Sequence, residues 1–342
     1  MLGAPHKADL AKREGFDNLT KERFVISRRR TGFGDCLWSL ASAWSYAQRT
    51  GRTLVVDWRG SCYIDRPFSN AFPVFFEPVE DIAGVPVICD DRINQLSFPG
   101  PFFPRWWNRP SIDCINRPDE QIFRERDELT ELFQAREDNE ANTIVCDACL
   151  MWRCGEAAER LIFRNIKLRS EIQARIDALY EEHFSGHSII GVHVRHGNGE
   201  DIMEHAPYWA DSELALRQVC MAIRKAKALP YPKPVKVFLC TDSAQVLDRL
   251  SGLFPDVFAV PKRFQADRAG PLHSAEMGIE GGASALIDMY LLARCATVIR
   301  FPPTSAFTRY ARLLVPRIIE FDQSNPERLT LIDNPYEHFA AS

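Results

Sequence analysis

Three short apolar runs in the second half of this 342-residue chain end in polar residues that could hold a phosphate group. The runs cover residues 189–195, 235–242 and 296–301, and the polar residues at or after their ends are Arg195, His196, Asn198, Thr241, Asp242 and Ser305. The guanidinium of Arg195 can give phosphate oxygens two charge-assisted hydrogen bonds, and a helix beginning near Ser305 would offer free N–H groups to the same anion. Because the carboxyl ends of parallel strands meet at one edge of a sheet, these residues predict a nucleoside diphosphate site. In that site Asp242 or Asp288 would accept a hydrogen bond from a base or a ribose hydroxyl.

Two further stretches lie in the first half of the chain. The sequence TGFGD at residues 31–35 looks like a shortened glycine-rich loop, in which Gly32 and Gly34 would let a ligand approach the backbone. It lacks the third glycine of the dinucleotide-binding fingerprint, so we expect a cleft wall and not an NAD site. The segment 96–113 is rich in proline and aromatic residues. Its side chains Trp106 and Trp107 are either an acceptor surface on which sugar rings stack, or core and oligomer contacts.

The elements that must position these groups alternate along the whole chain. Apolar runs typical of buried parallel strands occur at residues 24–28, 53–58, 85–91, 142–148, 189–195, 235–242, 296–301 and 317–321. Helical spacing follows Asp35 as an N-cap up to Gly51, follows a capping box of Ser170 and Gln173, and covers residues 212–228 and 283–295. The alternation predicts an α/β protein with two open, Rossmann-type parallel-sheet domains that face each other across a cleft. We expect a polar tail over residues 1–20, an N-terminal domain over 21–185 and a C-terminal domain over 186–342.

Composition excludes several functions. A formal net charge of −4 and a pI of about 6.1 argue against broad nucleic-acid binding, which requires a basic field. No apolar stretch approaches the roughly 20 residues of a membrane span, and the first residues lack the apolar core of a secretion signal, so a cytoplasmic protein is expected.

The ten cysteines favour reduced, buried thiols, above all Cys89, Cys220, Cys240 and Cys295, which lie within apolar runs. Cys146 and Cys149 have the spacing of a metal-binding pair, but a second pair is missing, and zinc is not expected. The chain also contains no Asp-x-Asp triplet of the kind that holds a divalent cation in many glycosyltransferases.

The motifs resemble those of a known family. GVHVRHGNGE at residues 191–200 resembles the His-x-Arg motif of the α1,6-fucosyltransferases, and VFLCTDSAQVL and SALIDMYLLARCATVIRFPPTSAFTRYARLL resemble their next two motifs. From about Thr20 onward the chain is similar to the rhizobial nodulation fucosyltransferases, beginning with TKERFVISRRRTGFGDCLWSL. The resemblance implies a GT-B fold and an inverting enzyme that needs neither metal nor cofactor. Its donor would be GDP-fucose, bound by the C-terminal domain. Its acceptor would be the 6-hydroxyl of the reducing-end N-acetylglucosamine of a chitin oligosaccharide or lipochitooligosaccharide, on the side of the N-terminal domain.

Carried over by position, the resemblance places Arg195 on the diphosphate as the main catalytic group. The donor-site motifs would also supply His193, Thr241, Asp242, Asp288 and Ser305. Glu204 is the favoured candidate for a general base, ahead of its neighbours Glu200, Asp201 and His205. The animal core-fucosylating enzymes continue the first motif with a second arginine, an aspartate and a lysine. Here His196 and Asn198 stand in that stretch, so their donor roles follow from location alone.

Two rival functions remain at this stage. Arg195-His196-Gly197 also begins the signature of histidine phosphatases, with His196 as the nucleophile, but that signature would be expected at the end of the first strand of the chain. A chitin-binding module without catalysis is the other alternative. The polar residues at three strand ends argue against it, because a lectin does not need a diphosphate site.

Overall fold

The computed structural model describes residues 22–66, 68–114, 122–135, 137–147, 155–198, 206–266, 269–270, 272–274, 276–322 and 328–334, so the expected tail over residues 1–20 lies outside the described residues. The chain divides into two compact units. The first unit consists of the chain up to Arg30, Cys36–Ser61 and Arg66–Lys167, and the second of Thr31–Asp35, Cys62–Asp65 and the chain from Leu168 onward. The main division therefore lies at residues 167 and 168, before the boundary expected near residue 185. Two short segments from the first half, one of them the glycine loop, join the second unit.

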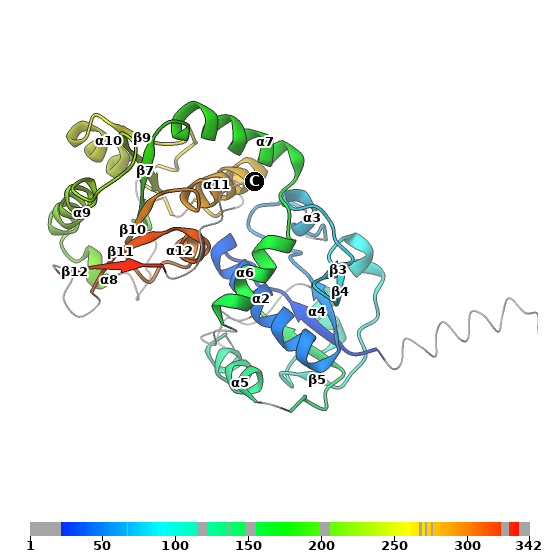
Figure 1. Ribbon diagram of the computed structural model, residues 1–342. Helices are drawn as coiled ribbons and strands as arrows, with labels where there is room; N and C mark the ends of the chain where they lie inside the picture. The colour runs from blue at the N-terminus through cyan, green and yellow to red at the C-terminus, as the bar shows by residue number, and fades with distance from the viewer. Residues whose placement is uncertain are drawn as a thin grey trace, which may run out of the picture. The chain divides into compact units, whose positions relative to one another are not determined.

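The first unit contains a six-stranded sheet in the order β3-β4-β2-β1-β6-β5 (Figure 1). Its strands are β1 (Phe24–Ser27), β2 (Thr53–Val56), β3 (Asp81–Ile82), β4 (Val85–Ile88), β5 (Phe102–Phe103) and β6 (Thr143–Cys146), and all neighbours are parallel except β3 and β4. Its helices are α2 (Phe33–Thr50), whose first residues belong to the second unit, α3 (Phe72–Phe75), α4 (Arg109–Cys114), α5 (Ile122–Gln134) and α6 (Glu156–Asn165), with a 3-10 helix η1 (Asp91–Gln95).

The two faces of this sheet are covered differently. On one face Phe24, Ile26, Val55 and Val145 form a core cluster with side chains of the aromatic segment, including Phe98. The other face is covered by α2, as the contact between Ser39 Oγ of α2 and Cys146 Sγ at 3.2 Å shows. Central strands covered on both faces explain their continuous apolar sequences.

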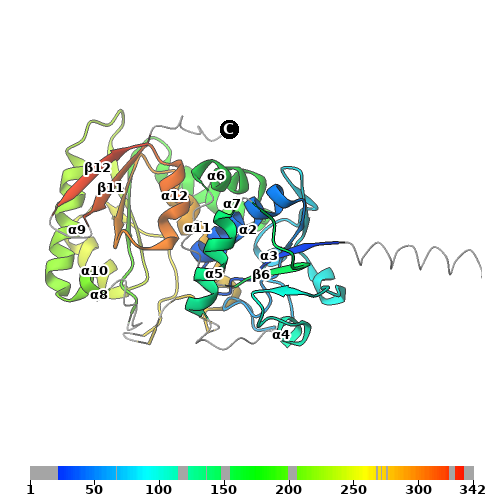
Figure 2. The same ribbon diagram turned by 90° about the horizontal axis from the view of Figure 1, so that it is seen from below.

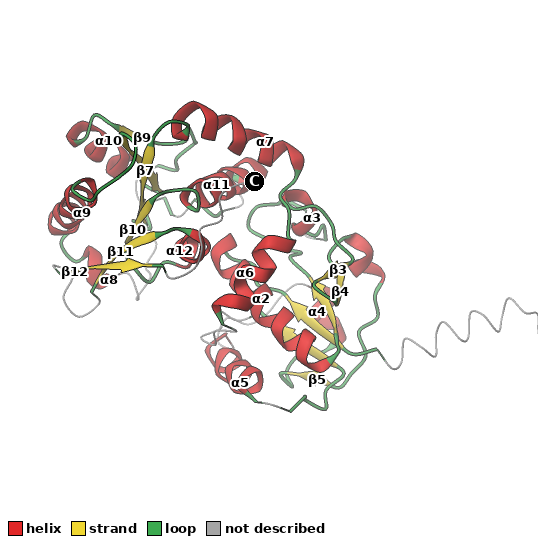
Figure 3. Cartoon of the chain, viewed as in Figure 1, coloured by secondary structure: helices red, strands yellow, loops and turns green. Residues whose placement is uncertain are grey.

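The second unit contains another six-stranded sheet, in the order β12-β11-β10-β7-β8-β9 (Figure 3). Its strands are β7 (Ser188–Val194), β8 (Val235–Thr241), β9 (Val257–Phe258), β10 (Thr297–Phe301), β11 (Arg317–Phe321) and β12 (Leu329–Asp333), and all neighbours are parallel except β11 and β12. Its helices are α7 (Ser170–Leu179), α8 (Ala206–Trp209), α9 (Ser212–Lys227), α10 (Ala244–Leu253), α11 (Gly278–Leu292) and α12 (Arg309–Leu314), with a π-helix η3 (Tyr180–Phe184) and a 3-10 helix η4 (Ala306–Thr308).

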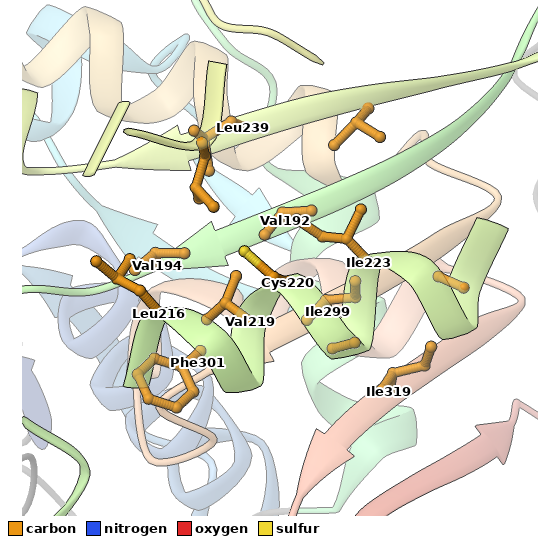
Figure 4. Close-up of a cluster of buried hydrophobic side chains, with 14 of the residues drawn as sticks. Val192, Val194, Leu216, Val219, Cys220, Ile223, Leu239, Ile299, Phe301 and Ile319 are labelled. Carbon is orange, nitrogen blue, oxygen red and sulfur yellow. The ribbon is translucent and has the colours of Figure 1, made fainter. Parts of the chain in front are cut away.

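Helices α9 and α10 lie along one face of this sheet and α11 along the other (Figures 1 and 2). Figure 4 shows α9 placing Leu216, Val219 and Ile223 against Val192 and Ile299 of the sheet. On the opposite face, a Cβ atom added to Gly191 would come within 2.8 Å of Leu292 of α11, so this helix packs directly on the β7 backbone. The predicted α/β fold with two parallel sheets is confirmed.

The structure confirms one predicted helix end and the buried thiols, and contradicts two predicted helix starts. Gly51 ends α2 with a φ of +66°, as expected of a helix stop. Asp35 lies inside α2 and Ser170 is the first residue of α7, which has no side-chain cap, so both N-cap predictions were wrong. Cys89, Cys220, Cys240 and Cys295 are buried free thiols, as predicted. Within the described ranges, no helix is both long and apolar enough to cross a membrane.

Candidate functional site

The three strand ends singled out in the sequence meet in the second unit. Strand β7 lies between β8 and β10, with His193 in register with Cys240 on one side and Arg300 on the other. The loops that follow the three strands therefore leave the same edge of the sheet side by side. This is the edge at which open α/β sheets bind their ligands.

Asp242 holds the loop after β7 in place. Its carboxylate accepts hydrogen bonds from the backbone N–H groups of His196 at 2.7 Å and Gly197 at 2.9 Å, and it forms an ion pair with the guanidinium of Arg195. Burial alone would raise the pKa of this carboxyl, but Arg195 and the two N–H groups outweigh burial and lower the pKa. Asp242 therefore stays ionised and fixes Arg195. This role differs from the predicted one of accepting a hydrogen bond from a base or ribose.

His193 and Ser305 contact each other. The Nε2 atom of His193 lies 3.0 Å from Ser305 Oγ, and its ring stacks on Phe307 with the ring centroids 5.0 Å apart. A helical turn does begin after Ser305, as predicted, but it is the short 3-10 helix η4, and the Ser305 side chain does not cap it. The hydroxyl instead links the end of β7 to the loop after β10.

Asn198 and His196 shape the loop after Arg195. Asn198 adopts a φ of +47°, and its side-chain amide donates to the carbonyls of Ala266 at 3.0 Å and Gly270 at 2.9 Å. The imidazole of His196 packs edge-on against Trp209, whose ring N–H donates to the Arg195 carbonyl at 2.8 Å. Asn198 thus joins this loop to the segment after β9. Its position in the sequence had suggested a contact to the donor, but not this structural role of its amide.

The glycine loop belongs to the same unit and approaches the loop after β10. A Cβ atom on Gly34 would come within 2.6 Å of the Ala306 backbone, whereas one on Gly32 would meet only Tyr63 and His273 at 3.8 and 4.0 Å. The sequence suggested that these glycines make room for a ligand. At Gly34 the backbone that needs the room is that of the protein itself.

A buried ion pair joins the segment after β9 to α11, and only its carboxylate was singled out in the sequence. Asp288 of α11 pairs with the ammonium of Lys262, which also lies 3.5 Å from the Thr241 carbonyl. Burial would lower the pKa of Lys262, but Asp288 outweighs it and raises the pKa, so the lysine is charged. Among the described residues, the second carboxylate oxygen of Asp288 has no hydrogen-bond partner. The predicted role of Asp288, a hydrogen bond to a base or ribose, stays a prediction.

The remaining predicted residues fall in different places. Thr241 is buried and accepts a hydrogen bond from the Ser243 N–H at 3.2 Å, so its hydroxyl shapes the start of α10. Glu204 and its neighbouring candidates for a base lie outside the described residues. Trp107 is 4% exposed, packs in the core of the first unit and lies under the Arg28 guanidinium. Of the two alternatives for Trp107, the structure therefore supports core packing and not an open stacking face, while Trp106 is only partly buried.

His273 was not found from the sequence. It lies beside Gly32, and burial together with the positive charge of Arg195 lowers its pKa to about 4. The signal that could have found it is weak, since it stands in an irregular segment without a motif. The part of the chain described here contains no cluster of three His, Cys, Asp or Glu side chains that could hold a metal ion.

Buried histidine should make the fold sensitive to acid. Burial, more than the nearby positive charges, lowers the pKa of His193 to about 3, whereas the unfolded chain binds that proton near pH 6.5. The unfolded state therefore holds more protons below pH 6.5, and the free energy of unfolding should fall by about 1.4 kcal/mol per pH unit from this residue as the pH drops from 6 to 4. Urea unfolding at several pH values, for the native chain and His193→Gln, measures the difference. His187→Gln, near the surface, is the control. Equal pH slopes in the native chain and His193→Gln would contradict the prediction.

The comparisons with known proteins agree with this geometry. The family described as Nodulation protein Z (NodZ) matches residues 21–340. Nodulation protein Z of Sinorhizobium fredii (strain NBRC 101917 / NGR234) is 73% identical over 311 residues, which cover 91% of this chain and 97% of the relative. Its counterpart in Bradyrhizobium diazoefficiens (strain USDA 110) is 68% identical over 340 residues, covering 99% and 91% of the two chains.

Solved structures give the same result. The structure of NodZ alpha-1,6-fucosyltransferase co-crystallized with GDP is 86% identical, with a TM-score of 0.81 over 93% of this chain and 100% of that one. The same enzyme soaked with GDP-fucose is 87% identical, also with a TM-score of 0.81, over 92% and 100%. Arabidopsis thaliana FUT1, at 13% identity and a TM-score of 0.51 over 94% and 82% of the chains, shares the fold alone.

The two mostly parallel Rossmann-type sheets form the GT-B fold that is shared with the fucosyltransferase structures. The similarity to NodZ alpha-1,6-fucosyltransferase over nearly the whole chain shows that this protein is a fucosyltransferase. The chain belongs to the nodulation protein Z family.

Proposed function

We propose that this chain transfers L-fucose from GDP-fucose to the 6-hydroxyl of the reducing-end N-acetylglucosamine of a chitin oligosaccharide or lipochitooligosaccharide, with inversion and without a metal ion. The observation that carries the proposal is the Arg195 guanidinium, held at the end of β7 by the buried Asp242 carboxylate. Relatives solved with GDP and with GDP-fucose support the choice of donor. The second unit would bind the donor and the first unit the acceptor, for which Trp106 remains a candidate.

The chemistry explains why a fixed arginine matters. The bond between fucose C1 and the diphosphate oxygen breaks, which leaves negative charge on GDP and positive charge on the sugar ring. Arg195 would meet the developing negative charge with a group that is already oriented, so little reorganisation is required. The acceptor oxygen then forms the new bond to C1 from the opposite face, and its proton passes to a base. Glu204 is our candidate for that base.

The donor contacts follow from the same arrangement. We propose that the neutral imidazole of His193, the loop of His196 and Asn198, and the free oxygen of Asp288 surround the nucleotide. Ser305, Thr241 and the glycines Gly32 and Gly34 would shape the walls of the site. Asp288 supports a contact to the base or ribose because its unpaired oxygen is buried, and a buried acceptor without a donor is costly.

Incubation with GDP-fucose and a chitin tetrasaccharide tests the proposal. We expect mass spectrometry to find one deoxyhexose on the reducing-end sugar, at the same rate with and without EDTA. NMR of the product, compared with the donor, reports whether the anomeric configuration inverts. If GDP-fucose stays intact, the proposed donor or acceptor is wrong. A rate that collapses in EDTA and returns with a divalent cation contradicts the metal-free mechanism alone.

A further inference from the structure

Arg300 is a charged residue inside a buried central strand. The other residues of strand β10 after Thr297 are apolar, and Arg300 lies in register between His193 of β7 and Glu320 of β11. The neighbouring residues Ile299 and Phe301 point into the core beneath α9, so Arg300 points to the opposite face of the sheet. Burying a guanidinium there is costly unless its donors are satisfied.

Most of the Arg300 donor groups bond to the loop that follows its own strand. The Nε atom donates to Thr308 Oγ1 at 2.6 Å, and Nη2 donates to the Pro303 carbonyl at 2.7 Å and, more weakly, to the Ser305 carbonyl at 3.5 Å. The Nη1 atom forms an ion pair with Glu320. The Thr308 hydroxyl in turn donates to the Ser305 carbonyl at 3.1 Å, so one side chain fixes the loop at several points.

This loop, residues 302–308, carries the contacts of the candidate site. Ser305 bonds to His193, the ring of Phe307 stacks on His193, and the Ala306 backbone lies against Gly34. A small displacement of the loop would therefore move both the histidine of the first motif and the glycine loop. Glu320 is itself held by Arg312 Nε of α12 at 3.3 Å, which leaves the guanidinium little freedom.

We infer that Arg300, through Thr308 and Glu320, is a positioning residue that sets the loop 302–308 for donor binding. The inference rests on the proposed function, because it concerns the site for the nucleotide sugar. The fork of a guanidinium is required, since a lysine ammonium in the same place cannot reach a carboxylate, a hydroxyl and two carbonyls in one plane. No covalent step is assigned to Arg300.

The sharpest test leaves the charge in place and removes one partner. Thr308→Val has nearly the same shape but cannot accept from Arg300 or donate to Ser305. We expect it to raise the KM for GDP-fucose and the Kd for GDP about tenfold, as for the loss of hydrogen bonds that order a site, with a smaller change in kcat. Thr308→Ser keeps the hydroxyl and should restore values near those of the native chain. Arg300→Lys should resemble Thr308→Val or be worse.

Arg317→Lys is the matched control, because this arginine on the neighbouring strand bonds to Pro230 and lies away from the loop. A purely structural role for Arg300 would lower the melting temperature and the active fraction but leave KM and Kd unchanged in the folded protein. That result, or unchanged GDP binding in both Thr308→Val and Arg300→Lys, would overturn the inference. Failure of the native chain to use GDP-fucose would instead refute the proposed function, and calorimetric binding of GDP keeps the two failures distinct.

Discussion

Replacing Arg195 with lysine should reduce fucosyl transfer about a hundredfold or more while the chain stays folded. Lysine keeps the positive charge but loses the planar fork that can bind two oxygens at once. It also cannot bond to Asp242 and to a phosphate group in the present geometry, because the carboxylate of Asp242 already takes one arm of the arginine. Initial rates with GDP-fucose and a chitin tetrasaccharide, with circular dichroism as the check on folding, measure the effect.

Two further variants separate the sources of this loss. Asp242→Asn retains the size of the side chain but removes the charge that orients Arg195, and we expect a rate between those of Arg195→Lys and the native chain. Arg217→Lys, an exposed arginine on α9, should behave like the native chain. Normal turnover in Arg195→Lys would contradict the proposal that Arg195 stabilises the leaving diphosphate.

The second large effect is expected at Gly34. A methyl group there would lie 2.6 Å from the Ala306 backbone, and neither backbone can give way as a flexible side chain would. We expect Gly34→Ala to cost about 1–3 kcal/mol of stability. We also expect it to displace the loop after β10 enough to reduce transfer about a hundredfold. Thermal unfolding and the same rate assay measure the two effects.

Gly32→Ala provides an internal control two residues away. Its methyl group would make only ordinary contacts, at 3.8 Å to Tyr63 and 4.0 Å to His273. It should therefore change stability little and leave most of the transfer activity. If both glycine variants lose activity equally while both remain stable, the glycine loop must serve a bound ligand, and the close approach of Ala306 is not the reason for Gly34.

The sequence by itself determined the elements and the place of the chemistry. All eight predicted strands are present. They could be recognised because a strand covered on both faces is apolar along most of its length. The edge strands β3, β5, β9 and β12 were missed. Three of them, β3, β5 and β9, are only two residues long and leave little pattern, and β12 has no fully buried residue. Arg195 and Asp242 were singled out correctly as neighbours, because residues that end adjacent parallel strands must meet at one edge of the sheet.

Only the tertiary structure decided what these residues contact. That Asp242 clamps Arg195, that Ser305 bonds to His193 in place of capping a helix, and that Lys262 pairs with Asp288 all depend on contacts between segments far apart in the chain. The sequence also does not decide the place of Trp107, because an aromatic side chain suits both a buried core and a surface that binds sugars. Only its packing shows that it belongs to the core. Periodicity records which face of an element is buried, but not which side chain of another element lies against it. Register and packing make that choice, and they are properties of the whole fold.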